Sequence, residues 1–144
     1  MNQNLITRVQ EIYQAFGRGD IAAVTAQLSD DASFGMVGRA KDVPMAGLRK
    51  GKKGAAEFFG LLHETQELRS FSPLKFAANE DMVFVLGHTQ WTMRRNGVEG
   101  ENAWVHVFTF DKSGLCTGFQ GHQDTGLLAE AYHSAPAAQR AAVA

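Results

Sequence analysis

The sequence predicts an α+β fold in which helices come first and a sheet follows. Three observations support this prediction. Apolar residues repeat at helical spacing near the N-terminus. Three strand-like segments follow one another from residue 82 onward, and they are joined by Asn96-Gly97 and by a four-residue turn at 111–114, both typical of hairpins. This order favours helices packed against an antiparallel sheet.

The composition fits one globular domain. The chain has 144 residues, with 14 Lys and Arg against 15 Asp and Glu, and its net charge of −1 argues against nucleic-acid binding. No apolar run reaches the roughly 18 residues of a membrane span, and the first residues lack a signal-peptide pattern. Cys116 has no second cysteine to pair with, and no Cys/His spacing suits a metal. We therefore expect a cytoplasmic protein without metal, cofactor, membrane or nucleic-acid partner.

The first two helices follow from periodicity and capping. Residues 5–16 are expected to be helical, and Gly17 and Gly19 end this helix. Asp20 is a suitable N-cap for a shorter second helix, whose buried stripe is expected to reach Leu28.

The middle of the chain is less regular. A short strand is expected over residues 32–37, followed by an irregular, glycine-rich stretch at 39–53. A third helix is expected from about residue 54 to residue 67. Pro73 is then placed in a connection rather than in a strand.

The second half of the chain is expected to form the sheet. The predicted meander has three strands, over residues 82–94, 102–110 and 115–124. A short helix over 125–133 closes the domain, which therefore spans residues 1–133. Residues 134–144 are rich in alanine and are expected to form a flexible tail.

The faces of the predicted strands indicate a second copy of the chain. In residues 82–94 the side chains of both parities are largely apolar, whereas a sheet with one wet face alternates cleanly. Three helices cover one face only. We therefore expect a homodimer that packs through the outer face of the sheet.

Five stretches also carry a resemblance to a known family, at residues 16–21, 28–34, 87–92, 105–110 and 119–125. Together they resemble the nuclear transport factor 2-like superfamily, in its SnoaL-like and ketosteroid-isomerase-like branch. The resemblance implies a cystatin-like α+β cone, with three N-terminal helices packed in a curved mixed or antiparallel sheet. It is a guide to fold rather than to chemistry, because the superfamily includes isomerases, cyclases, dehydratases, epoxide hydrolases and proteins without catalysis.

The resemblance further implies an apolar pocket between the concave face of the sheet and the helices. The residues implied to contact a small apolar or carbonyl-containing ligand are Trp91, Trp104, Phe108, Phe119, Thr89, Met36 and Phe58. A cavity lined by aromatic side chains with one polar group suits such a ligand. The alternative is that the aromatic side chains simply fill the core, where each tryptophan needs a partner for its indole N–H.

The positions that match catalytic groups of ketosteroid isomerases hold other residues here. Met36 matches the general base and cannot abstract a proton, and Ile12 matches the tyrosine, which leaves Tyr13 turned to another face. His106 matches the acid that donates to the oxyanion, and an imidazole can act as base, acid or neutral donor near pH 7. The alternative for His106 is a core histidine whose nitrogens are both satisfied.

Asp124 is the second catalytic candidate. SnoaL-like cyclases and limonene epoxide hydrolases place an acidic residue on the last strand, where Gly121 stands in this chain. Asp124 lies three residues further on. It is either the N-cap of the helix that begins at Thr125 or, after a one-residue slip in register, an acid facing the pocket.

Two classes of function remain open from the sequence. The first is a SnoaL-like pocket protein that binds a small apolar or carbonyl-containing molecule. The second is a small cofactor-independent enzyme of the isomerase, cyclase, dehydratase or hydrolase type, which uses His106 as acid–base or as oxyanion donor.

Overall fold

The computed structural model describes residues 2–136, and of Asn2 and Gln3 only the backbone. Its helices are α1 (Asn2–Gly17), α2 (Ile21–Ala26), α3 (Gly51–Thr65) and α4 (Thr125–His133). Its strands are β1 (Leu28–Met36), β2 (Gly47–Lys50), β3 (Gln66–Asn79), β4 (Met82–Met93), β5 (Glu99–Phe110) and β6 (Cys116–Gln123). The expected α+β class is confirmed, although β1 and β2 precede α3 and α4 follows the last strand.

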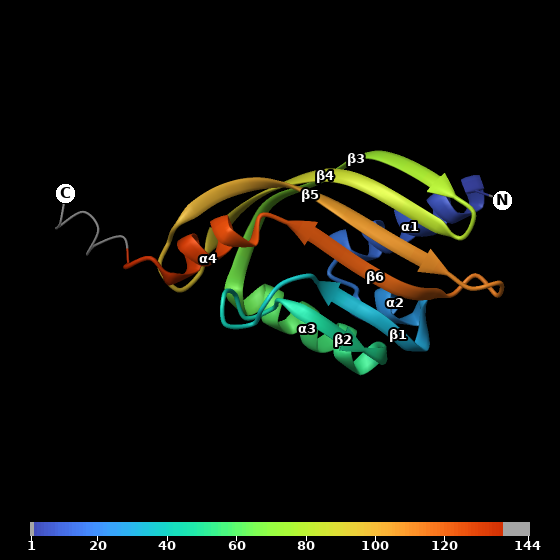
Figure 1. The fold of residues 1–144 in the computed structure, drawn as a ribbon, viewed down its shortest axis with the longest axis horizontal. Coiled ribbons are helices and arrows are strands. Elements are labelled where there is room, and N and C mark those ends of the chain that lie inside the picture. The colour runs from blue at the N-terminus through green and yellow to red at the C-terminus, as the bar shows by residue number, and fades with distance from the viewer. Residues whose placement is uncertain (1, 137–144) are drawn as a thin grey trace.

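The six strands form one curved sheet in the order β2-β1-β6-β5-β4-β3. Neighbouring strands are antiparallel except β1 and β6, which are parallel, so the sheet is mixed. In Figure 1 the long strands β3 to β5 pass over α1, and β1 and β2 lie beside α3 at the opposite side. The helices α1 and α3 therefore pack inside the curve, whereas α4 lies beside the β4–β5 turn, where the Asn96 amide donates to the Ala131 carbonyl at 2.8 Å.

The second helix is shorter than predicted. Asp20 caps α2 as expected, with its carboxylate accepting from the backbone N–H of Ala23 at 3.0 Å. However, the helix ends at Ala26, and Leu28 already belongs to β1, where it pairs with Cys116. The apolar stripe was misassigned at Leu28 because an inward-facing strand residue and a helix residue bury the same kind of side chain.

The prediction missed two strands. The stretch at 39–53 contains β2, and α3 begins earlier than expected, at Gly51, whose backbone φ is +73°. The connection around Pro73 is in fact the 14-residue strand β3. Proline is tolerated there because β3 is an edge strand, and the pairing with β4 shifts register between Pro73 and Lys75.

The remaining elements lie close to their predicted positions. The two expected turns join β4 to β5 and β5 to β6, and β5 begins three residues earlier than expected, at Glu99. The closing helix α4 has the predicted bounds. The expected tail over 134–144 lies mainly outside the described residues, from 137 onward.

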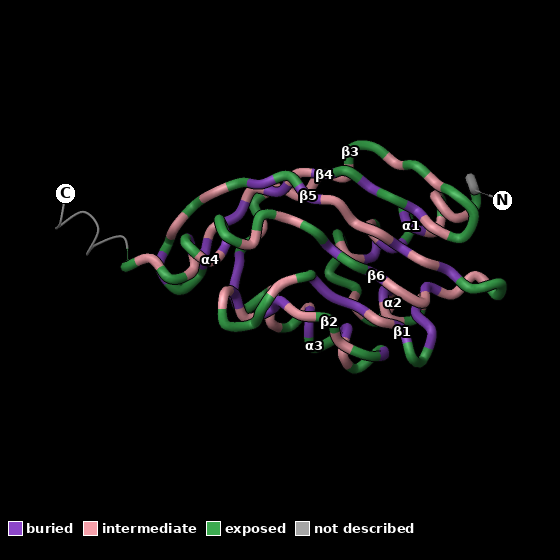
Figure 2. The backbone as a smooth tube through the Cα atoms, in the orientation of Figure 1, coloured by how far each residue is buried: buried purple, intermediate pink, exposed green. Residues whose placement is uncertain are grey.

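Burial alternates along the central strands (Figure 2). On β4, Val83 and Val85 are fully buried on the concave face, whereas Phe84 and Leu86 on the outer face are 37% and 50% exposed. This alternation separates a concave face that packs against the helices from a convex face that carries exposed apolar side chains. No helix within residues 2–136 is long and apolar enough to cross a membrane.

Candidate functional site

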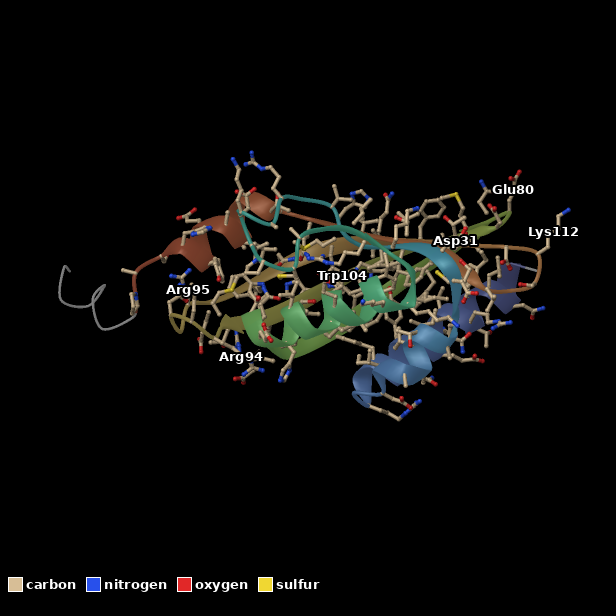
Figure 3. All side chains as sticks on the ribbon, turned by 90° about the horizontal axis from the view of Figure 1, so that it is seen from below. Asp31, Glu80, Arg94, Arg95, Trp104 and Lys112 are labelled. Atoms are coloured by element: carbon tan, nitrogen blue, oxygen red, sulfur yellow. The ribbon has the colours of Figure 1, made fainter. Side chains whose placement is uncertain are left out.

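A cavity of about 90 Å³ lies between the concave face of the sheet and the helices α1 and α3. All the residues predicted to contact a ligand line it: Trp91, Trp104, Phe108, Phe119, Thr89, Met36 and Phe58. In Figure 3, Trp104 lies in the interior beneath α3, whereas the labelled charged residues Glu80, Arg95 and Lys112 project from the periphery. Whether these lining residues bind a ligand stays a prediction.

His106 lies among aromatic rings on the cavity wall. Its imidazole stacks on Trp104, with 3.8 Å between ring centroids and 18° between ring planes. The imidazole also makes a T-shaped contact with the Phe119 ring, with 4.8 Å between centroids and 75° between ring planes. Both contacts come from neighbouring inward-facing positions of the sheet, so they follow from strand alternation.

Tyr13 is the hydrogen-bond partner of His106, which corrects the prediction that it faces elsewhere. Its hydroxyl lies 2.9 Å from Nδ1 of His106, and both residues line the cavity. Ile12 lines the cavity too. Successive helix residues are about 100° apart, and the sheet curves far enough around α1 to contact both.

Both members of this pair are neutral at pH 7. Burial, together with repulsion from His122 on the neighbouring strand, lowers the pKa of His106 from its usual 6.5 to about 3. Burial also raises the pKa of the Tyr13 phenol well above its usual 10. Because both groups are neutral, either the phenol or Nδ1 of the imidazole carries the one proton that lies between them.

The Tyr13 hydroxyl assigns the tautomer of His106. Within residues 2–136 the phenol has no other hydrogen-bond partner, so donation to Nδ1 is the arrangement that pairs its proton, and on that ground we assign the imidazole proton to Nε2. In this part of the chain, every side-chain nitrogen or oxygen that is sealed from water has a hydrogen-bond partner. Nε2 of His106 has no partner there, so it cannot be sealed from water. The Nε2–H group is therefore open to the cavity.

The two tryptophans are held by side chains of the opposite strand. The indole of Trp104 donates to Thr89 Oγ1 and that of Trp91 donates to Asn102 Oδ1, each at 2.7 Å. Each ring also lies across a glycine of the paired strand, which for Trp91 is Gly100. A Cβ atom at Gly100 would lie 2.5 Å from the Trp91 ring, so these rings can lie flat only against glycine.

The structure does not bring Asp124 to the cavity. Its carboxylate accepts from the backbone N–H of Leu127 at 3.0 Å and caps α4, which was the alternative reading of this residue. Gly121 lies opposite His106 on β6. A Cβ atom there would lie 3.5 Å from Cδ2 and 3.7 Å from Nε2 of the imidazole, so the matching acid position adjoins His106 but holds no acid.

Gln66 is a lining residue that sequence reasoning missed. It is only 6% exposed, at the junction of α3 and β3, and its side-chain amide has no hydrogen-bond partner within residues 2–136. It was missed because the third helix was expected to run to residue 67, whereas α3 ends at Thr65 and Gln66 begins β3. Had that strand been recognised, Gln66 would share the parity of Leu68, which also lines the cavity.

A larger outer groove of about 860 Å³ lies against the cavity wall. Six side chains line both hollows: Phe16, Phe59, Leu62, Gln66, Leu68 and Phe71. The ring of Phe16 contacts those of Phe59 and Phe71, with centroids 5.6 and 5.1 Å apart. Arg94, labelled below α3 in Figure 3, borders the groove on its outer side. These six side chains form the wall between the cavity and the groove.

The family model of the SnoaL-like domain matches residues 9–119 of the chain. The protein belongs to the SnoaL-like domain family. Two solved NTF2-like proteins are similar across its length. One, from Burkholderia xenovorans LB400, is 26% identical with a TM-score of 0.82, over 92% of this chain and 98% of that one. The other, from Burkholderia pseudomallei K96243, is 25% identical with a TM-score of 0.82, over 91% and 98%.

More distant structures share the fold of this SnoaL-like domain. TerC, co-crystallised with polyporic acid, is 22% identical with a TM-score of 0.77, over 90% of this chain and 98% of that one. An epoxide hydrolase of the LEH-like type from M. tuberculosis is 16% identical with a TM-score of 0.69, over 91% and 90%. No curated protein matches the sequence.

The cavity of this SnoaL-like domain has an uncharged wall. Among the described residues that line it there is no Asp, Glu, Lys or Arg, and Tyr13 and His106 are its titratable groups. Residues 2–136 also contain no cluster of three or more His, Cys, Asp or Glu side chains placed to hold a metal ion. Cys116 is buried, and burial raises the pKa of its thiol to about 11, so no thiolate forms near neutral pH.

Proposed function

We propose that this SnoaL-like domain binds a small, uncharged, largely apolar molecule that carries a carbonyl or a similar hydrogen-bond acceptor. The observation that supports the proposal most strongly is the open Nε2–H group of His106 in an aromatic, charge-free cavity. A ligand oxygen that reaches this open donor gains a hydrogen bond on an otherwise apolar wall. The surrounding rings provide the apolar contacts that small ligands need.

The size of the cavity limits the ligand. A volume of about 90 Å³ holds roughly six to nine water molecules, at about 10–15 Å³ for each. This suits one or two fused rings better than a steroid. The absence of a charged lining residue also disfavours carboxylates and amines, because moving an unpaired charge into such a cavity is expensive.

The proposal is tested with three probes of one shape: indane, 2-indanone and 2-aminoindane. Both tryptophans of the chain line the cavity, so quenching of their fluorescence reports binding directly. We expect 2-indanone to bind about fivefold more tightly than indane, since one net hydrogen bond is worth about 1 kcal/mol. We expect the protonated amine to bind most weakly.

A matched double variant isolates the contribution of the polar pair. Tyr13→Phe with His106→Phe replaces both partners by rings, so neither is left as an unsatisfied buried group. This variant should bind indane and 2-indanone equally. If the wild type binds neither probe, the proposal is wrong.

A small enzyme remains the second candidate, and one observation supports a narrow form of it. An imidazole whose pKa is about 3 is neutral near pH 7, so His106 fits an oxyanion donor better than an acid–base catalyst. The matching test is deuterium incorporation at the α-carbons of 2-indanone in D₂O. Exchange that is faster with wild-type protein than with the Tyr13→Phe/His106→Phe variant supports catalysis, and equal rates exclude it for this ketone.

The proposal includes a second copy of the chain. Phe84 and Leu86 form the centre of an exposed apolar strip on the convex face, and Val107 and Val105 lie opposite them on β5. A homodimer that packs through this face would remove the strip from water. The single buried thiol of Cys116 suits a reducing compartment, so we also propose a cytoplasmic location.

A further inference from the structure

Gln66 presents an unused carboxamide inside an apolar wall. The backbone N–H of this residue closes α3 by donating to the Leu62 carbonyl. The side chain is 6% exposed and lies among cavity-lining residues such as Leu62 and Leu68, yet its amide contacts no donor or acceptor within residues 2–136. A carboxamide has two N–H donors and one carbonyl acceptor to satisfy.

The surroundings of the Gln66 amide show from which side a hydrogen-bond partner can reach it. In the described part of the chain, every polar side-chain atom that water cannot reach has a hydrogen-bond partner. Because the Gln66 amide has no partner there, it must be open to one of the two hollows that Gln66 lines. The other amide on the cavity wall, that of Gln123, is already engaged: it accepts from Asn102 at 2.8 Å and donates to the Met36 sulfur. Gln66 therefore differs from Gln123 in having all its hydrogen-bonding capacity free.

Gln66 and His106 lie at opposite ends of the concave face. His106 pairs with Val85 on β4, and Gln66 pairs with Met93 on the same strand. These partners are eight residues apart, which is about 26 Å along the strand, and the sheet curves between them. The free amide is thus a recognition point separate from the imidazole, on the wall shared with the outer groove.

We propose that Gln66 recognises an uncharged ligand group that has both a donor and an acceptor, such as a carboxamide, at the groove end of the cavity. This inference rests on the proposed function, because the apolar body of the same ligand would occupy the cavity. Two carboxamides pair through reciprocal N–H···O=C bonds, which use the donor and the acceptor of Gln66 at once. An ester offers only an acceptor and leaves the Gln66 carbonyl without a partner.

The groove beside Gln66 gives no net preference for an anion. The charged groups that border it are Arg94 and Glu67, which have opposite signs, and the Arg94 Nε already donates to the His63 carbonyl at 2.7 Å. A carboxylate would also meet the Gln66 carbonyl as a second acceptor. We therefore expect neutral ligands to be preferred over their carboxylate analogues.

The test compares cinnamamide, methyl cinnamate and cinnamate, which share one aryl body, by quenching of tryptophan fluorescence at pH 7. Wild-type protein should bind cinnamamide about tenfold more tightly than the ester. Gln66→Met keeps the length of the side chain and removes the amide, so the two should bind equally to it. Gln14→Met, on the exposed side of α1, should keep the tenfold preference.

The readout separates Gln66 from His106, because the Nε2–H group of His106 only donates and treats amide and ester alike. A second measurement needs no variant: the side-chain NH₂ signals of Gln66 in ¹⁵N-labelled protein should shift with cinnamamide and much less with methyl cinnamate. Equal binding of both probes by the wild type, or a preference that survives in Gln66→Met, overturns the inference and leaves the proposed function intact. If cinnamate binds most tightly of the three, the proposed preference for uncharged ligands is wrong. If none of the three binds, the proposed function fails as well.

Discussion

The hydroxyl of Tyr13 lies 2.9 Å from Nδ1 of His106, although 93 residues separate them in the sequence. This one contact sets the tautomer of the imidazole and aims its Nε2–H group at the cavity. It also explains how a histidine is accommodated in an aromatic wall: half of its hydrogen-bonding capacity is satisfied internally, and the other half faces the hollow.

His106 should make the stability of the protein depend on pH. Its pKa is about 3 in the folded chain and near 6.5 when unfolded, so between these values the unfolded state binds more protons. The free energy of unfolding should therefore fall as the pH falls from 6.5 toward 3, by up to about 1.4 kcal/mol per pH unit. Tyr13 stays neutral throughout, and electrostatic repulsion from His122 on the neighbouring strand adds to the effect of burial in lowering the pKa of His106.

The measurement is chemical denaturation of wild type and His106→Gln at pH 7, 6, 5 and 4. The difference between the two removes the contribution of the carboxylates that both proteins share. We expect the stability of the wild type relative to the variant to decline steadily below pH 6.5. Parallel pH profiles would show that His106 is not held neutral by the fold.

Gly121→Asp should raise the pKa of His106 from about 3 to about 4–6. A Cβ atom at this position meets the imidazole at 3.5–3.7 Å without a clash, so the new carboxylate adjoins the ring. An opposite charge at this range raises the pKa of a histidine by about 1–3 units. An NMR titration of His106 should show the rise in Gly121→Asp and not in Gly121→Ala, and equal titration curves for the two variants would contradict the prediction.

Gly100→Ala should destabilise the domain by about 1–3 kcal/mol, because the added methyl would lie 2.5 Å from the Trp91 ring and force the ring to move. Gly60→Ala is the control, since a Cβ atom at this exposed position of α3 has no neighbour within 4 Å. It should stabilise α3 by about 0.5–1 kcal/mol. Thermal and urea unfolding report both changes, and a neutral Gly100→Ala would mean that Trp91 does not lie against the strand.

Phe84→Asp should separate the expected homodimer into monomers. It places a charge in the centre of the convex apolar strip, where burial against a second copy would leave it unpaired. Leu127→Asp is matched in exposure, at 39% against 37%, but lies on α4. Sedimentation analysis should give a dimer for the wild type and for Leu127→Asp. A wild-type monomer would contradict the assignment of this face.

Much of the sheet could be predicted from local patterns. Alternation along residues 82–94 places Trp91 on the concave face and Phe84 on the convex one, and the structure agrees. Asp124 followed by the apolar residues of α4 has the pattern of an N-cap, and the carboxylate does cap that helix. These features depend on neighbours within a few residues, so the sequence contains the information to assign them.

Local patterns failed where long-range pairing decides the structure. Pro73 and polar residues hide the periodicity of β3, which is stabilised as a strand by pairing along the edge of β4. Leu28 fits a helical stripe and an inward-facing strand position equally well, and its pairing with Cys116 decides for the strand. The third helix was predicted to extend past Gln66, which in fact begins β3, so its inward-facing position was not recognised.

The sequence by itself determined the α+β order, the aromatic concave face and the absence of an acid at Met36 and Gly121, because residue identity and strand parity are local properties. Only the tertiary structure decided that Tyr13 is the partner of His106, that Asp124 is outside the cavity and that the Gln66 amide has no hydrogen-bond partner within residues 2–136. The rotation of α1 inside the sheet and the curvature of the strands set these distances. Both arise from packing between distant segments, and no periodicity within one segment specifies them.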